Sequence, residues 1–317
     1  MAALLVATAV TCDIFNRHPT TRFATADLAL DVAVRNDTLV VAQNDSGILF
    51  LDISNPKSPQ HLQRLILFKK CVCVAFGDST VYAGLNKGLY GFDLRGTGGV
   101  FSLSPLGESA GVTALLEDST RLYMASADGI SLFDVTRSWV PDAIRFYPLA
   151  GHPTGLARHD SRLFVSLRDW GVRVFNIMPG ESLELVLDTI RLGRHNRAEG
   201  VTCTPGGYCI IAQGDSGMIA IYTPTPDSVG SHGGGGAGGA GTASYATAAA
   251  GDAKETSIYT ADSSTVTFNK ITYGATGGSI SGEVGTNLEG FTRRICLGGN
   301  GYIYTASDDA GVYIIRQ

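Results

Sequence analysis

The chain has 317 residues, of which 44% are hydrophobic and 17% are charged, and its formal net charge is −5. This composition supports a large core, and the acidic balance argues against non-specific binding of nucleic acid, which requires a basic surface. No apolar run reaches the length of about 18 residues that a membrane-spanning helix needs. The 40 glycines suit a fold with many turns.

The N-terminus, MAALLVATAVTC, contains an apolar stretch like the central part of a secretory signal peptide. The basic segment that begins such peptides is missing, because the first Lys or Arg is Arg17. A cytoplasmic location is therefore favoured over secretion or the cell surface. Two segments here, Leu4 to Ala9 and Cys12 to Asn16, also have the pattern of short strands.

One strand-like segment returns along the chain at spacings of 41 to 49 residues. Its copies are TLVVAQ at 38, TVYAGL at 80, RLYMAS at 121, RLFVSL at 162, YCIIAQ at 208, SIYTAD at 257 and YIYTAS at 302. A period of about 40–50 residues with four short strands per unit is typical of a β-propeller. We therefore predict an all-β fold, a single β-propeller domain over residues 1–317, with seven blades of four antiparallel strands. Eight blades are the alternative, because seven leave the segments of residues 4–16 unused.

Each repeated strand ends in a turn rich in Asp, Asn and Gly, where glycine supplies positive φ and Asp or Asn bonds its own backbone. A third strand follows and ends in an apolar–acidic or apolar–amide step. In the first four units this step is Leu51-Asp52-Ile53, Phe92-Asp93-Leu94, Phe133-Asp134-Val135 and Phe175-Asn176-Ile177. We expect the apolar flanks to pack between sheets and the polar residue to cap the next turn.

The inner and outer strands complete each unit. Inner strands are predicted at 29–35, 71–76, 112–117, 153–158, 200–204, 244–250 and 292–298, and outer strands at 60–67, 99–104, 143–149, 183–190 and 279–284. The fifth unit has no recognisable outer strand, and we interpret its glycine tract as a flexible insertion at about 228–244. The last unit ends after its third strand, so we expect Thr20 to Asp27 to supply the missing strand and close the ring.

The first unit resembles a known repeat. Leu39-Val40-Val41-Ala42, followed by Gly47 and Leu51-Asp52-Ile53-Ser54-Asn55-Pro56, is similar to the LVIVD repeat. The match is fair in the next three units and poor beyond about residue 220, where Tyr222, Lys270 and Arg316 replace the Asp. LVIVD repeats occur in propellers of extracellular or surface proteins and of uncharacterised ones. The resemblance implies a non-enzymatic interaction propeller.

The six cysteines, at 12, 71, 73, 203, 209 and 296, include no C-x-x-C pair, so a zinc ribbon or a thioredoxin-type centre is not expected. Cys71 and Cys73 alternate along one strand and are expected to face the same side. Cys203 and Cys209 flank a turn, and a hairpin would place them opposite each other. We favour buried, reduced side chains for these cysteines, with the redox state of the second pair left open.

Candidate binding residues lie on the loops between outer and inner strands and on the Asp-rich turns, which share one face of a propeller around the channel. They are Trp170, Arg168, His152, His195, Arg197, Glu199, Glu289 and Arg293, and Lys69, Lys70 and Arg294 lie on the same loops. Glu199-Gly200 and Glu289-Gly290 are interpreted as equivalent, which predicts two carboxylates near the channel mouth. Trp170 is either an interface anchor beside Arg168 or folds over the neighbouring blade. Trp139 is predicted on the opposite face.

We predict a non-enzymatic scaffold, a monomeric propeller that binds a protein or peptide on its loop face. No catalytic residue or metal ligand is assigned, because no nucleophile motif or calcium loop is present. No cofactor is assigned either, and no nucleic-acid partner is expected from the acidic net charge. One alternative is a lactonase-like, metal-dependent hydrolase of small molecules, with its site at the channel mouth. The other is a secreted or cell-surface adhesion module.

Overall fold

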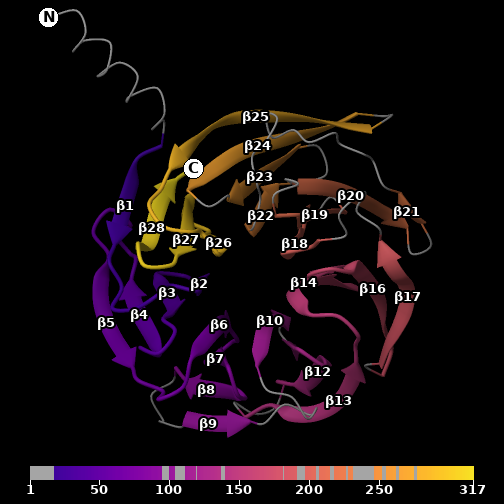
Figure 1. Cartoon of the computed structure of the whole chain (residues 1–317), viewed down its shortest axis with the longest axis horizontal. Helices are drawn as coiled ribbons and strands as arrows, with labels where there is room; N and C mark the ends of the chain where they lie inside the picture. The colour runs from indigo at the N-terminus through magenta and orange to yellow at the C-terminus, as the bar shows by residue number, and fades with distance from the viewer. Residues whose placement is uncertain are drawn as a thin grey trace, which may run out of the picture.

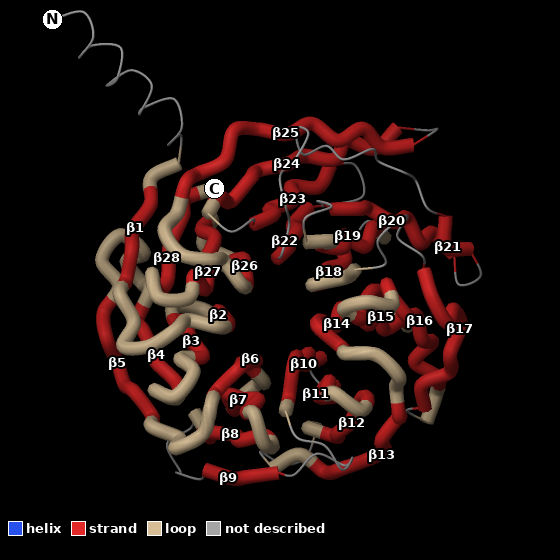
Figure 2. Tube along the Cα trace, viewed as in Figure 1, coloured by secondary structure: helices blue, strands red, loops and turns tan. Residues whose placement is uncertain are grey.

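The computed structural model describes residues 18–94, 100–103, 111–118, 120–136, 140–180, 182–190, 197–204, 207–214, 218–225, 228–230, 246–251, 255–261, 264–274 and 277–317. The regular elements of this part of the chain are all β-strands, and they form seven four-stranded sheets. The sheets stand like blades in a ring around a central channel (Figure 1; Figure 2). The predicted all-β propeller is confirmed. The same residues include no helix long and apolar enough to cross a membrane.

The first four blades each consist of four consecutive strands, ordered from the channel outward. The first contains β2 (Asp31–Arg35), β3 (Thr38–Ala42), β4 (Ile48–Asp52) and β5 (Gln60–Leu65). The second contains β6 (Cys71–Phe76), β7 (Thr80–Leu85), β8 (Leu89–Asp93) and β9 (Val100–Leu103). The third contains β10 (Val112–Asp118), β11 (Arg121–Ser126), β12 (Gly129–Asp134) and β13 (Asp142–Pro148). The fourth contains β14 (Pro153–His159), β15 (Arg162–Leu167), β16 (Gly171–Met178) and β17 (Ser182–Ile190).

The remaining blades include the one that joins the two ends of the chain. The fifth contains β18 (Gly200–Cys203), β19 (Tyr208–Ala212), β20 (Met218–Thr225) and β21 (Ser228–Gly230). The sixth contains β22 (Ala246–Gly251), β23 (Glu255–Ala261), β24 (Thr265–Gly274) and β25 (Gly277–Asn287). The last contains β26 (Arg294–Leu297), β27 (Tyr302–Ser307), β28 (Gly311–Arg316) and β1 (Thr20–Phe23). The expected closure by an N-terminal strand is confirmed, while residues 4–16 lie outside the described residues.

Alternate residues of the middle strands pack into two different interfaces between blades. Leu39 and Val41 of β3 belong to the cluster that contains Tyr304 of the last blade. Val40, between them, belongs to the cluster that contains Val81 of the second blade. A strand covered on both faces must be apolar throughout, which explains the continuous apolar runs of the repeat.

The acidic residues at the ends of the third strands cap the following turns where the structure gives their bonds. Asp52 Oδ1 accepts a hydrogen bond from the backbone N–H of Ser54 at 2.8 Å, and this bond lowers the pKa of Asp52. Asp134 Oδ1 accepts from the backbone N–H of Thr136 at 2.7 Å. The predicted capping role is confirmed for these two residues.

The fifth blade corrects the predicted limits of the glycine insertion. Ser228–Gly230 forms the outer strand β21, which pairs with β20 through Thr225↔Ser228 and Tyr222↔Gly230. An outer strand can be held by backbone hydrogen bonds alone, so the short Ser-Val-Gly segment carries no apolar pattern. Residues 228–230 are therefore not part of the predicted insertion, and its remaining residues, 231–244, lie outside the described residues.

The two cysteine pairs differ from the predictions, and Cys71 and Cys73 do not face the same side of their strand. Cys71 and Cys73 are both buried, but Cys71 packs between the first two blades and Cys73 between the second and third. The register shifts between these two residues, so that Cys71 pairs with Leu85 and Cys73 with Gly84. An extra residue in a strand reverses its alternation, which explains why the two thiols face opposite sides.

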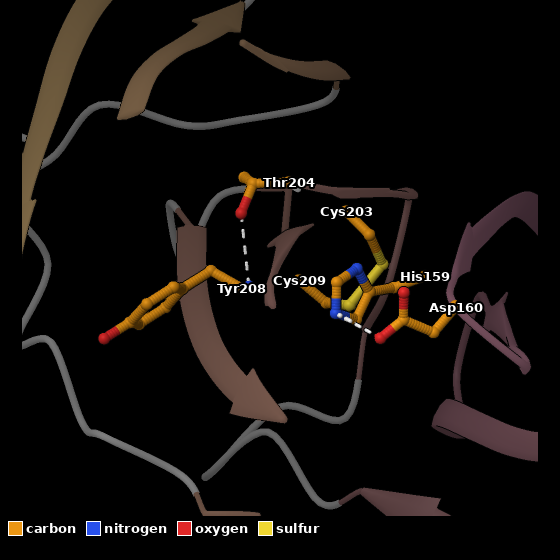
Figure 3. Close-up of a disulfide and its surroundings, with 6 residues drawn as sticks. All are labelled: His159, Asp160, Cys203, Thr204, Tyr208 and Cys209. Carbon is orange, nitrogen blue, oxygen red and sulfur yellow. Dashed lines mark hydrogen bonds and ion pairs between the residues drawn. A yellow bond between two sulfur atoms is a disulfide. The ribbon is translucent and has the colours of Figure 1, made fainter. Parts of the chain in front are cut away.

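Cys203 and Cys209 form a disulfide, so the preference for reduced thiols is wrong at this pair (Figure 3). The two residues are direct cross-strand partners in β18 and β19. Just beyond them, the backbone N–H of Tyr208 donates to Thr204 Oγ1 at 3.2 Å, which continues the hairpin (Figure 3). Among the described residues, the free cysteines are Cys71, Cys73 and Cys296.

The disulfide predicts a distinct pattern of alkylation. In protein denatured without reductant, iodoacetamide should label Cys71, Cys73 and Cys296 but not Cys203 or Cys209. Because the bond closes a loop in the unfolded chain, replacing both cysteines by serine should lower the free energy of unfolding by about 2 kcal/mol. Peptide mass spectrometry and urea denaturation measure the two effects. Labelled Cys203 and Cys209 in unreduced protein would contradict the assignment.

Candidate functional site

The channel contains two cavities that meet at one arginine. The deeper cavity, about 410 Å³, is lined by inner strands of all seven blades. The second cavity, about 390 Å³, lies where these strands begin, on the face that carries the loops between blades. Arg294 lines both cavities. We call the second cavity the mouth.

The mouth is lined at one structural position that recurs from blade to blade. In three blades this residue is the extra residue of a β-bulge, where the register shifts on either side of Val72, Thr113 or Thr154. In three other blades, the residue lies just before the inner strand. Its N–H donates to the carbonyl of an alanine on the second strand, and the same alanine pairs with the first residue of the inner strand. These residues are Leu30, Glu199 and Arg293, which donate to Ala42, Ala212 and Ala306. All six residues line the mouth. Bulges commonly re-aim side chains next to functional sites, and here they set the chemistry of the channel entrance.

Four arginines line the mouth, and three of them have partners. They are Arg168, Arg197, Arg293 and Arg294. The Arg197 Nε pairs with a Glu199 carboxylate oxygen, within the mouth itself. Arg293 makes a two-point contact with Asp308, in which Nη2 lies 3.0 Å from Oδ2, and its guanidinium lies 5.4 Å from the centre of the Phe291 ring.

Arg294 crosses the channel. It begins β26 in the last blade, and its Nη2 donates to the carbonyl oxygen of Thr154 in the fourth blade at 2.7 Å. Its Nε lies 4.0 Å from Oδ1 of Asp31 in the first blade. The side chain therefore connects three blades and separates the mouth from the deeper cavity.

Asp31 is the carboxylate of this arrangement, with a side chain that is only 13% exposed, and sequence reasoning missed it. Its oxygens accept hydrogen bonds from the backbone N–H groups of Val32 at 2.9 Å and Val74 at 3.0 Å. Burial raises its pKa to about 6, against the opposing effects of the Arg294 guanidinium and these two hydrogen bonds. The available signal was one charged residue inside the apolar inner strand LALDVAV.

The structure brings together only part of the predicted set. Arg168, Arg197, Glu199 and Arg293 all line the mouth, whereas His152 is exposed on the β13–β14 loop and lines neither cavity. The His152 backbone carbonyl accepts a hydrogen bond from the N–H of Arg168 at 2.9 Å. His195 lies outside the described residues, as does Trp139 on the other predicted surface.

The predicted equivalence of Glu199 and Glu289 is wrong. Glu199 directly precedes β18, but three more residues, Phe291 to Arg293, separate Glu289-Gly290 from β26. Glu289 instead forms an ion pair with Arg22 of the outer strand β1, and its side chain is 75% exposed. Arg293 occupies the position equivalent to Glu199, so the mouth contains a cation where a second carboxylate was expected.

Trp170 is partly packed against its surroundings, and its predicted role as an interface anchor stays a prediction. Its ring packs over the β13–β14 loop, where a Cβ added to Gly151 would lie 3.5 Å from ring atoms of Trp170. The Arg173 guanidinium lies 5.9 Å from the ring centre. The side chain is still 48% exposed and does not line the mouth. Trp170 is therefore a partly packed surface residue beside the cavity.

The described residues offer little for metal or thiol chemistry. In this part of the chain, no group of three or more His, Cys, Asp or Glu residues lies close enough together to hold a metal ion. The Cys296 thiol lines the deeper cavity, and burial raises its pKa to about 11. Burial also raises the pKa of the Cys73 thiol well above its ordinary value. Both thiols stay protonated near neutral pH and are weak nucleophiles.

Comparison with known proteins supports the fold alone. No protein-family model matches the chain, and no curated protein matches it. A solved structure of the mitotic checkpoint complex has a similar chain, with a TM-score of 0.71 at 14% identity over 96% of this chain and 92% of that one. The WD40 repeats of RRP9 give 0.67 at 14% identity over 94% and 99%. Virginiamycin B lyase from Staphylococcus aureus gives 0.66 at 11% identity over 95% and 100%.

The raised pKa of Asp31 predicts a pH dependence of stability. Between the unfolded pKa of about 3.9 and the folded pKa of about 6, the folded chain holds the proton more tightly. The free energy of unfolding contributed by this group should therefore fall as pH rises from about 4 to about 6, by up to about 3 kcal/mol, and then stay constant.

Urea denaturation of the wild-type chain and Asp31→Asn at several pH values measures this effect. The free energy of unfolding of the wild type minus that of the variant should decrease as pH rises from about 4 to about 6, since the asparagine does not titrate. A difference that stays constant or increases would show that folding does not raise the pKa of this carboxyl.

Proposed function

We propose that this chain is a non-enzymatic scaffold, a monomeric propeller that binds a protein or peptide partner on the face that carries the mouth. The observation that carries this proposal is Phe68, on the loop between β5 and β6. Its side chain is 91% exposed, and its backbone adopts a φ of 54°. Ile66, two residues earlier, is 62% exposed. A bulky side chain in a left-handed conformation is uncommon and unfavourable, and such strain accumulates at functional sites.

The base of this loop is fixed by the turns beside it. The backbone N–H of Cys71 donates to the Asn44 carbonyl at 2.8 Å, and the N–H of Asn86 donates to the Lys70 carbonyl at 2.9 Å. The ammonium group of Lys69 lies 5.3 Å from the centre of the Tyr90 ring. The loop thus presents an aromatic side chain from an ordered base. Such preorganisation lowers the entropic cost of binding, and central aromatic residues often dominate the energy of an interface.

Similar structures leave the choice of function open, because they include both WD40 repeats and lyases. The resemblance of the first unit to LVIVD repeats supports an interaction role. A metal-dependent hydrolase is less consistent with the mouth, whose described lining contains four guanidinium groups and one carboxylate, that of Glu199, while Asp308 and Asp31 lie beside Arg293 and Arg294. This wall would repel a divalent cation.

The disulfide supports one further candidate, a secreted or cell-surface module. Disulfides persist mainly in oxidising compartments, and Cys203–Cys209 is such a bond. This candidate changes the compartment in which the propeller would act and leaves the binding face unchanged. Thiol alkylation on protein from its natural source, rather than on recombinant protein, distinguishes the two compartments.

The proposed function predicts that Phe68 anchors the partner. The intact chain serves as bait, and captured proteins are compared with those retained by Phe68→Ser. For a partner that depends on Phe68, calorimetry should show that this variant binds at least about 30-fold more weakly, as expected for a hot spot of about 2 kcal/mol. The melting temperature should change little, because the ring makes little contact with the core.

Leu185→Ser is the matched control, since Leu185 is a 48% exposed apolar side chain on the outer strand β17. It should bind the partner as the wild type does. Partners that bind Phe68→Ser and the wild type equally well would contradict the proposal.

A further inference from the structure

We propose that the mouth recognises an acidic peptide segment by receiving one of its carboxylate side chains, with Arg168 as the principal contact. This inference rests on the proposed function and adds the chemistry of the partner. The chain carries a formal net charge of −5, yet its channel entrance gathers four guanidinium groups. An anion that binds here is therefore attracted by a local site, against the overall charge of the protein.

Three of the four arginines of the mouth lie beside carboxylates of described residues. Arg197 is paired with Glu199, Arg293 with Asp308, and Arg294 lies beside Asp31. Arg168 is the fourth cation, and its guanidinium has no hydrogen bond or ion pair to another described residue. The surplus positive charge of the mouth is therefore concentrated on Arg168.

Arg168 is held in place by its backbone. Its N–H donates to the His152 carbonyl at 2.9 Å, and its own carbonyl accepts from the Ala198 N–H at 3.0 Å. These bonds connect the β15–β16 turn to the loops on either side, so the base of the side chain is fixed while the guanidinium is exposed. A guanidinium presents a planar set of donors that matches a carboxylate in two-point contact.

Arg294 lies between the mouth and the deeper cavity. Arg294, bonded to Thr154, forms the floor and leaves the loop face as the entrance. Leu30, Val72 and Pro153 supply apolar wall beside the arginines. Such a wall can pack against the methylene groups of a glutamate while its carboxylate meets Arg168. This combination favours a peptide side chain over a small inorganic anion, which has no apolar part.

The surface beside the mouth adds further positive charge and an exposed aromatic side chain. The β5–β6 loop, on the same face, carries exposed Phe68 followed by Lys69 and Lys70. The Lys70 side chain is 55% exposed, and its ammonium nitrogen lies 4.0 Å from an Asp45 carboxylate oxygen, so the lysine is only loosely paired. A peptide chain that leaves the mouth toward this loop would meet further positive charge and an apolar anchor. The partner segment is thus expected to combine acidic and apolar residues.

Calorimetry with the full-length chain and blocked hexaglutamate tests the inference. Hexaglutamate should bind, and its affinity should fall as salt is added, while the neutral isostere hexaglutamine should not bind. Arg168→Gln should weaken hexaglutamate binding at least tenfold, and Arg168→Lys should have a smaller effect. The control is Arg145→Gln, which removes an exposed arginine from the outer strand β13 and should change nothing. Melting temperatures verify that each variant is folded.

Three results would overturn the inference. Arg168→Gln and Arg145→Gln could weaken binding equally, which would mean general electrostatic attraction. Inorganic phosphate could bind as tightly as hexaglutamate and compete with it, which would mean a site for small anions. A partner that requires Phe68 could bind Arg168→Gln as well as the wild type, which would remove the role of the mouth while the proposed scaffold function stands. If the proposed scaffold function itself is wrong, Phe68→Ser should instead bind every partner that the wild type binds.

Discussion

The structure depends on the pairing of β1 with β28, which joins the two ends of the chain within one blade. Thr20 to Phe23 pair with Ile315 to Val312, so the last sheet has its fourth strand and the ring is closed. The approach is tight: a Cβ on Gly311, whose φ is +89°, would lie 2.4 Å from the carbonyl oxygen of Phe23. Arg22 strengthens the junction by donating from Nε to the Ala310 carbonyl at 2.8 Å. Without this strand, β28 would be an open sheet edge.

Ring closure also builds the mouth, because the closing blade supplies two of its four arginines. Arg293 occupies the recurring position at the entrance, and Arg294 extends across the channel to the carbonyl of Thr154. These contacts can form only when the last blade and the fourth lie on opposite sides of a closed channel. The stability of the ring and the chemistry of the candidate site are therefore coupled through the position of β26.

The sequence predicted the strands that recur in every blade, but it could not predict local departures from the repeat such as bulges and contacts across the channel. The recurring apolar runs identified the propeller and its strands, because a strand buried on both faces has a distinctive composition. The bulge at Val72 reversed the expected direction of Cys71 and Cys73, since an inserted residue leaves the composition unchanged. The contact between Arg294 and Asp31 joins residues far apart in the chain, and no local pattern indicates it.

The sequence located candidate-site residues whose position is fixed by the repeat. It failed for residues whose position depends on the length of a loop. Glu199 was placed correctly because it precedes its strand directly, whereas Glu289 was misplaced by the three residues inserted before β26. Phe68 gave no signal, because an apolar residue after an apolar strand is normally buried, and only its exposure of 91% distinguishes it.

The most direct test of ring closure by β1 compares two N-terminal deletions by light scattering and thermal melting. Removing residues 1–17 keeps β1, and this chain is the reference for size and melting temperature. Removing residues 1–28 deletes β1 and exposes the edge of β28, so that chain should melt at lower temperature and associate. A chain lacking residues 1–28 that stays monomeric with an unchanged melting temperature would contradict the central role of ring closure.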